Sequence, residues 1–264
     1  MKLAPKVLAG ALSAAAAAVI AGVALSPAST AAVQAAASPK TDTPLAGIVI
    51  ALDPGHQLGN SNPQFFDELA QTHYNGYETK ICNTSGTATN AGFPEATFNW
   101  NVALLVKEQL EALGADVKMT RHSNSWKKWG PCVNERGQFG AKVGADLMLS
   151  IHGDGAAPAG YGFFVIEPAV IKGWTDDIAA KSVRMGKKFI AGMADAGAPR
   201  STYIAGQMMV TSGISTLNFS DVPVILLESG NMRNAADAAR MSSAQGQQQY
   251  ADWIIAGLRA ALRK

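Results

Sequence analysis

The sequence has few of the residues from which compact metal-binding motifs are built. It contains two cysteines and four histidines among 264 residues, and it has neither an HExxH motif nor a CxxC pair. Without HExxH, a metal site must be assembled from residues that lie far apart in the sequence. Without CxxC or a similar spacing, the cysteines have no support as metal ligands. Internal repeats and a second module are also lacking, so the sequence predicts one domain.

The chain also lacks a strong charge of either sign. Its formal net charge is +2. Loss of the first 35 residues would remove Lys2 and Lys6 and no acidic residue, leaving a net charge of zero. A protein with so little net charge has no electrostatic reason to bind nucleic acid or an anionic membrane surface. We therefore expect no nucleic-acid partner.

One long apolar run stands at the N-terminus, over residues 7–25, and two lysines precede it. Small residues follow, which is the layout of a secretory signal peptide. The 19 residues could instead span a bilayer as an uncleaved anchor, but alanine is weakly apolar and small residues follow at once. No cysteine lies near the run, which argues against a lipoprotein anchor.

We therefore expect a signal peptide over residues 1–35, a linker over residues 36–46 and the folded domain over residues 47–264. The stretch 31–45, rich in alanine, serine, threonine and proline, is expected to pack against nothing. The mature protein is expected in the periplasm or cell wall, or secreted, with no stable membrane insertion after signal cleavage.

The two cysteines, Cys82 and Cys132, both lie in the part predicted to be exported. In an oxidising compartment an isolated pair most simply forms one disulfide. Two free thiols are the alternative.

Apolar runs alternate with segments of helical spacing along the rest of the chain. This alternation predicts one α/β domain, with a twisted, largely parallel central β-sheet flanked by helices. Strands are expected at residues 47–52, 116–120, 147–151, 162–166 and 224–227, with a strand or hairpin arm at 207–211. Helices are expected at about 94–113, 132–143 and 175–196, from residue 234, and through the C-terminal residues 250–262.

Two polar segments interrupt this pattern, residues 57–94 and residues 197–223. The first is rich in glycine, asparagine and threonine and has no clear period, with Cys82 near its middle. A loop of this length in a compact domain is more often functional than idle. We expect Cys82 to anchor it.

Chemically useful side chains follow three of the apolar runs. His56 comes after the first strand through the turn Asp53-Pro54-Gly55, and His152 and Glu228 directly follow two later strands. The carboxyl ends of parallel strands meet at the edge where open α/β sheets place their sites. We therefore expect these three side chains to lie near one another.

A fourth residue, Glu95, opens a predicted helix. His56, Glu95 and His152 could supply the three imidazole and carboxylate ligands that zinc takes in a hydrolase, leaving a fourth position open. Glu228 would then be the nearby proton acceptor.

Each of these residues also has a structural interpretation. A histidine at a strand end is often merely exposed, and Glu95 could simply favour a helix N-terminus. Glu228 is harder to explain in this way, because a carboxylate after four apolar residues risks burial and needs a partner. The residues alone leave the metal site and the structural roles open.

The combined pattern resembles a known family. The blocks DPGH at 53–56, SIH at 150–152 and LLES at 226–229 occur in that order, with Glu95, Thr120-Arg121 and Arg136 between them. This order is similar to that of the zinc-dependent N-acetylmuramoyl-L-alanine amidases of the Amidase_3 family. Each block alone is weak, whereas their combination is specific. The single-domain form behind an alanine-rich signal peptide resembles the stand-alone mycobacterial members.

The resemblance implies one zinc ion per chain, held by His56, Glu95 and His152, with Glu228 as the catalytic glutamate. In such enzymes the metal polarises the scissile carbonyl and activates water, and the glutamate passes a proton to the leaving amine. The bond cut joins N-acetylmuramic acid to L-alanine, so the expected partner is peptidoglycan or a muropeptide. Arg121 and Arg136 fall on recurrent family positions, as substrate-binding residues or as structural ion-pair partners.

Other activities stay open at this point. The chain could be a zinc peptidase cutting within the stem peptide, or a non-catalytic peptidoglycan-binding protein. Gly153-Asp154 replaces the family's usual Ala-Asn, and the 57–94 loop is longer than in the shorter family forms. This loop or the 197–223 segment could therefore restrict entry to the site. We expect a monomer that prefers small soluble muropeptides to intact wall.

Overall fold

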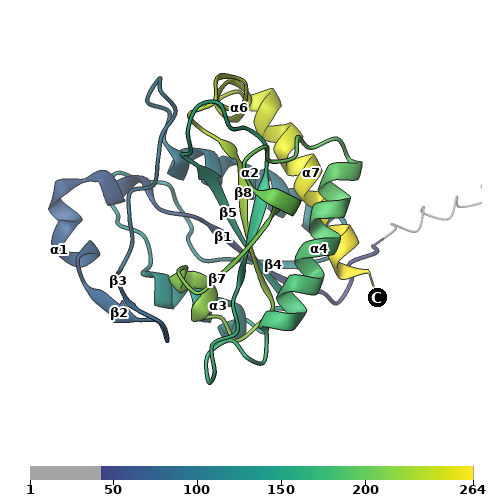
Figure 1. Cartoon of the computed structure of the whole chain (residues 1–264), viewed down its shortest axis with the longest axis horizontal. Coiled ribbons are helices and arrows are strands. Elements are labelled where there is room, and N and C mark those ends of the chain that lie inside the picture. The colour runs from purple at the N-terminus through teal and green to yellow at the C-terminus, as the bar shows by residue number, and fades with distance from the viewer. Residues whose placement is uncertain (1–42, 264) are drawn as a thin grey trace, which may run out of the picture. The chain divides into compact units, whose positions relative to one another are not determined.

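The computed structural model describes residues 43–263 (Figure 1). Its centre is a six-stranded sheet with the order β4-β1-β5-β8-β6-β7. All neighbouring pairs are parallel except β6 and β8, which confirms the predicted α/β fold with a largely parallel sheet. The strands are β1 (Val49–Pro54), β4 (Asp116–Met119), β5 (Leu147–Asp154), β6 (Phe164–Pro168), β7 (Met208–Thr211) and β8 (Val224–Asn231).

Helices cover both faces of this sheet. Figure 1 shows α4 and α7 side by side, and they share one face with α2, which also packs on α7. The shorter α3 and α5 pack together on the other face. The bounds are α2 (Glu95–Ala112), α3 (Val133–Lys142), α4 (Ala179–Asp195), α5 (Ser215–Asn218), α6 (Ala235–Met241) and α7 (Ala244–Leu262).

The strands β1, β5 and β8 owe their place to runs of consecutive apolar side chains, which bury both faces of the sheet because successive side chains of a strand point to opposite faces. The core under α2, α4 and α7 takes Ile50, Leu52, Leu147, Leu149, Ile151, Ile225 and Leu227. The core under α3 and α5 takes Ala51, Met148, Val224 and Leu226. By the same alternation, the polar side chains of Asp53 and Ser150 belong to the face under α3 and α5.

The long polar segment after β1 has a small core of its own. A disulfide joins Cys82 of this segment to Cys132, which lies just before α3. Their Cα atoms lie 4.4 Å apart, and the predicted pairing is confirmed. Phe65, Leu69 and Trp129 pack around the two cysteines. The segment contains η1 (Leu58–Ser61), η2 (Pro63–Phe65), α1 (Phe66–Leu69) and an antiparallel pair of strands, β2 (Thr72–Tyr74) and β3 (Thr79–Ile81).

The predicted signal peptide and most of the predicted linker lie outside the described residues. The expectation that the chain packs against nothing up to residue 45 is wrong for Leu45, which is buried in the core under α2 and α7. Its backbone N–H also donates to the Leu113 carbonyl at 3.0 Å. Packing therefore begins before the first strand. Within residues 43–263 no helix is both long enough and apolar enough to cross a membrane.

Candidate metal site and active site

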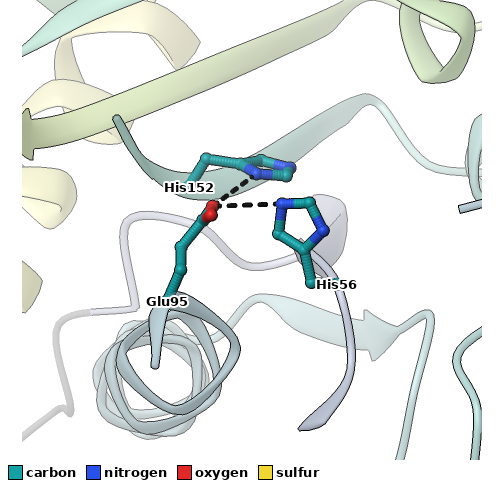
Figure 2. Close-up of side chains that lie close together, drawn as sticks. All are labelled: His56, Glu95 and His152. Carbon is teal, nitrogen blue, oxygen red and sulfur yellow. Dashed lines mark hydrogen bonds and ion pairs between the residues drawn. The ribbon is translucent and has the colours of Figure 1, made fainter. Parts of the chain in front are cut away.

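His56, Glu95 and His152 come together at the carboxyl ends of the strands (Figure 2). Glu95 Oε1 lies 3.2 Å from His56 Nε2 and 2.9 Å from His152 Nδ1. One potential ligand atom from each residue lies within 4.8 Å of the other two. The structure thus brings together the three residues predicted as ligands, from the turn after β1, the first turn of α2 and strand β5.

The turn that carries His56 has an unusual backbone. His56 itself adopts a positive φ of 58°, which costs free energy for a residue other than glycine and is often found at functional sites. Gly55 precedes it, and a Cβ at that position would overlap the His152 ring. Gly86, at φ +79°, packs just as closely, since its Cβ would lie 2.6 Å from Glu95 Oε2. Both glycines are needed for the three ligands to approach.

Hydrogen bonds orient two of the proposed ligands. His56 Nδ1 lies 2.9 Å from the Thr84 carbonyl oxygen and donates to it in the tautomer that leaves Nε2 free toward Glu95. Glu95 Oε2 accepts from the Thr87 backbone N–H at 2.8 Å, and Oε1 accepts from Asn99 Nδ2 at 3.2 Å. The side-chain atoms proposed to bind the metal are therefore held in place by the surrounding chain.

The charge of Glu95 suits a cation. Burial opposes its ionisation, but His56 and His152 together hold the pKa of its carboxyl well below the ordinary value. An ionised carboxylate and two imidazoles form a donor set that Zn²⁺ takes in hydrolase sites. The residues present therefore fit the metal that the sequence predicts.

Arg136 is bonded to the turn that carries His56. Its Nη1 lies 2.6 Å from Asp53 Oδ1, with both side chains buried, and its Nη2 donates to the His56 carbonyl at 2.7 Å. Asp53 also accepts hydrogen bonds from the hydroxyls of Thr120 and Ser150, at 2.6 and 2.7 Å. Burial alone would raise the pKa of Asp53, but these partners bring it below the ordinary value. Arg136 is thus committed to holding the turn.

Arg121 holds the same turn from the other side. Its Nε donates to the Pro54 carbonyl at 2.9 Å and its Nη2 to the Ala96 carbonyl at 2.9 Å. Its guanidinium also stacks over the Trp100 ring, 5.0 Å from the centroid. These contacts favour a structural role for both predicted arginines, and Arg121 joins the turn to α2 rather than forming an ion pair.

Glu228 lies on the strand next to His152 and lines the same cavity as both histidines. It pairs in register with His152 in strands β8 and β5, and all three line a cavity of about 300 Å³. Its Oε2 is buried and has no hydrogen-bond partner in the described part of the chain. Burial, together with the charges of Glu95 and Asp154, raises the pKa of Glu228 well above the ordinary value. Such a carboxyl is suited to proton transfer.

Strands β5 and β8 extend past the predicted ends at Ile151 and Leu227. Pairing continues to Asp154 and Asn231, with an irregularity between His152 and Asp154. His152 and Glu228 therefore stand inside strands instead of just beyond them, which fixes their separation through the backbone ladder.

The sequence interpretation assigned no role to several residues of the site. Asp53 is a carboxylate that directly follows an apolar run, and the argument used for Glu228 would have predicted a buried partner for it. No pattern marks Thr84, because its contribution is a backbone carbonyl. Asn99 lies four residues after Glu95, a helical spacing that brings the two side chains together.

Comparison with known proteins identifies the family of this chain. The profile of the Amidase_3 family, described as N-acetylmuramoyl-L-alanine amidase, matches residues 50–260. The N-acetylmuramoyl-L-alanine amidase Rv3717 of Mycobacterium tuberculosis is 34% identical over 219 residues, which cover 83% of this chain and 88% of the relative.

Two solved amidase structures are also similar to this chain. The crystal structure of Ami1 from Mycobacterium smegmatis, an N-acetylmuramyl-L-alanine amidase, is 36% identical with a TM-score of 0.76, covering 83% of this chain and 98% of that one. The apo form of Ami1 from Mycobacterium abscessus is 35% identical with a TM-score of 0.75, covering 83% and 100%. The chain described here therefore belongs to the Amidase_3 family of N-acetylmuramoyl-L-alanine amidases.

Proposed function

We propose that the protein hydrolyses the amide bond between N-acetylmuramic acid and L-alanine in peptidoglycan or muropeptides. One observation carries this proposal: two imidazoles and an ionised carboxylate converge beside Glu228, whose Oε2 has no partner among the described residues. The family and the named activity of the relatives supply the bond that is cut.

His56, Glu95 and His152 would hold one zinc ion. When bound, zinc supplies Lewis-acid chemistry, polarising a carbonyl and acidifying water. The chain's own part is to keep the three ligands in position before the metal arrives. The Thr84 carbonyl orients the ring of His56, and Asn99 orients the carboxylate of Glu95. The absence of a side chain at Gly55 and Gly86 allows the turn to approach closely.

Glu228 would move the proton. Its carboxylate accepts a proton from the attacking water and passes it to the nitrogen of the leaving L-alanine. The β5 and β8 backbone ladder holds this carboxylate beside His152.

The test measures the zinc content of the protein, the mass of the released peptide and the effect of one substitution. Purified protein should bind one zinc per chain and release from muropeptides a peptide that begins with L-alanine, identified by mass spectrometry. Glu228→Gln should retain zinc and lose cleavage by about 10²-fold or more. Glu108→Gln is the matched control, because Glu108 is exposed and lies on α2 away from its first turn.

Other results would contradict the proposal. Cleavage within the stem peptide would identify a peptidase, and zinc binding without any cleavage would indicate a non-catalytic binding protein. Unchanged cleavage by Glu228→Gln would remove the proposed role of that residue.

The protein is proposed to act outside the cytoplasmic membrane, where the disulfide between Cys82 and Cys132 is favoured. Small soluble muropeptides are the proposed substrates, since the cavity of about 300 Å³ beside Glu228 suits a short fragment. Equal rates on cross-linked sacculi and on muramyl dipeptide would contradict this preference. The monomeric state stays a prediction, to be measured by light scattering.

A further inference from the structure

We infer that Lys80 binds a carboxylate of the substrate's peptide, just beyond the bond that is cut, and so makes the cavity selective for acidic over amidated stem peptides. The inference rests on the proposed function. It concerns one side chain on β3 that the proposed chemistry does not use.

The charges that line the cavity leave one cation available. Asp53 and Arg136 neutralise each other as a buried pair, and the histidines belong to the proposed metal cluster. Lys80 also lines the cavity, and its side chain is 44% exposed. Among the described lining residues, Lys80 is therefore the charged cation with an exposed side chain, whereas Arg136 is buried.

The present partner of Lys80 is easily exchanged. Its Nζ lies 3.0 Å from Glu78 Oε1, and the Glu78 side chain is 37% exposed. An ion pair between two such exposed groups typically contributes about 0–1 kcal/mol. A substrate carboxylate that enters the cavity lined by Lys80 can therefore take the place of Glu78.

The strand that carries Lys80 is fixed at both ends. Asn75 closes the β2–β3 hairpin by accepting the N–H of Glu78 at 2.8 Å, and its Nδ2 donates to Ser215 Oγ at 2.9 Å. At the other end, Cys82 is held by the disulfide. Figure 1 shows β2 and β3 together at one side of the central sheet, near α1. The position of the Lys80 backbone is therefore well defined.

The distance to the metal cluster suits a short peptide. Lys80 stands four residues before Thr84, whose carbonyl accepts from His56, so at most about 14 Å of extended chain separates their Cα atoms. One extended residue spans about 3.5 Å, and a lysine side chain covers several ångströms more. Since Lys80 lines the same cavity as His56 and His152, we expect its ammonium to meet a carboxylate one or two residues beyond the scissile bond.

The test compares N-acetylmuramoyl-L-alanyl-D-glutamate with its monoamide and its diamide. Wild-type protein should show a KM about two- to fivefold lower for the dicarboxylate than for the diamide, with a similar kcat, which is the size expected of one partly exposed ion pair. Lys80→Met should remove this difference by raising KM for the dicarboxylate, whereas Glu78→Gln should lower that KM. Added salt should weaken the preference, because it screens an exposed charge.

Lys118→Met is the matched control. Lys118 lies in β4, is also 44% exposed and pairs with the acidic residue two positions before it, Asp116, at 2.8 Å. It does not line the cavity, so its loss should leave all three KM values unchanged.

The outcomes separate the two proposals. Equal KM values for dicarboxylate and diamide in the wild type, or a preference that survives Lys80→Met, would overturn the role of Lys80 while leaving the amidase activity intact. A wild type that cleaves none of the three compounds at the amide bond would overturn both.

Discussion

Arg136 and Asp53 form a buried ion pair, Nη1 to Oδ1 at 2.6 Å, between α3 and the end of β1. The same guanidinium donates to the His56 carbonyl at 2.7 Å. A proposed metal ligand is therefore held by a pair of charges that touches neither metal nor substrate in the proposed scheme.

Replacing Arg136 with methionine should destabilise the protein and weaken zinc binding. The substitution leaves the Asp53 carboxylate buried without its charged partner, which typically costs about 3–5 kcal/mol. Denaturant unfolding and zinc titration measure the two effects. The exposed pair Lys107–Glu111 on α2 provides the control, since Lys107→Met should cost under about 1 kcal/mol and leave zinc affinity unchanged. A stable Arg136→Met protein with normal zinc affinity would show that the pair does not position His56.

Gly55→Ala should abolish zinc binding. The new methyl group would occupy the space of the His152 ring, so that ring must move away from Glu95. Zinc per chain, measured by mass spectrometry of the metal, should fall from one toward zero. Gly47→Ala is the comparison, because Gly47 has open space around its Cβ position, so any strain from its positive φ should leave the zinc content unchanged. Full zinc content in Gly55→Ala would refute the packing argument.

Reducing the disulfide should destabilise the long segment and the site together. The bridge closes a loop of 50 residues, and chain entropy assigns such a loop about 4 kcal/mol. Cys82 lies two residues from Thr84, which orients His56, so zinc affinity should fall as well. Unfolding with and without reductant, compared with the Cys82→Ser/Cys132→Ser double variant, measures this. Reductant should have no effect on the double variant, and an unchanged wild type would contradict the prediction.

Glu167 in β6 should make the protein less stable as the pH rises. It is fully buried, neither carboxyl oxygen has a hydrogen-bond partner in the described residues, and burial raises its pKa to about 9. The folded state keeps the proton while the unfolded state releases it near pH 4.5. The free energy of unfolding therefore falls between about pH 4.5 and 9, by roughly 3 kcal/mol at pH 7.

Glu167→Met removes the titrating group and its two unpaired oxygens. The variant should be more stable than the wild type at pH 8, and the advantage should shrink toward pH 5, as measured by urea unfolding across this range. Glu167→Gln separates charge from polarity, since it should flatten the pH dependence while retaining buried polar atoms. A stability difference that does not change with pH would mean that Glu167 does not titrate in this way.

Local patterns were enough to predict the fold class and the approach of the site residues. Consecutive apolar side chains in β1, β5 and β8 commit each strand to two buried faces. Because His56, His152 and Glu228 follow such runs, they were expected at one edge of a parallel sheet, with Glu95 added from the start of a predicted helix. The antiparallel β6 was not predicted, because a short apolar run does not encode its direction.

What the sequence by itself determined about this protein is therefore local: which segments are strands and helices, and which side chains stand at their ends. The tertiary structure alone decided that Arg136 neutralises Asp53 across 83 residues, that the Thr84 carbonyl orients His56, and that Lys80 enters the cavity. The physical reason is that periodicity follows from the backbone of one segment, whereas these contacts join segments whose meeting depends on how the whole core packs.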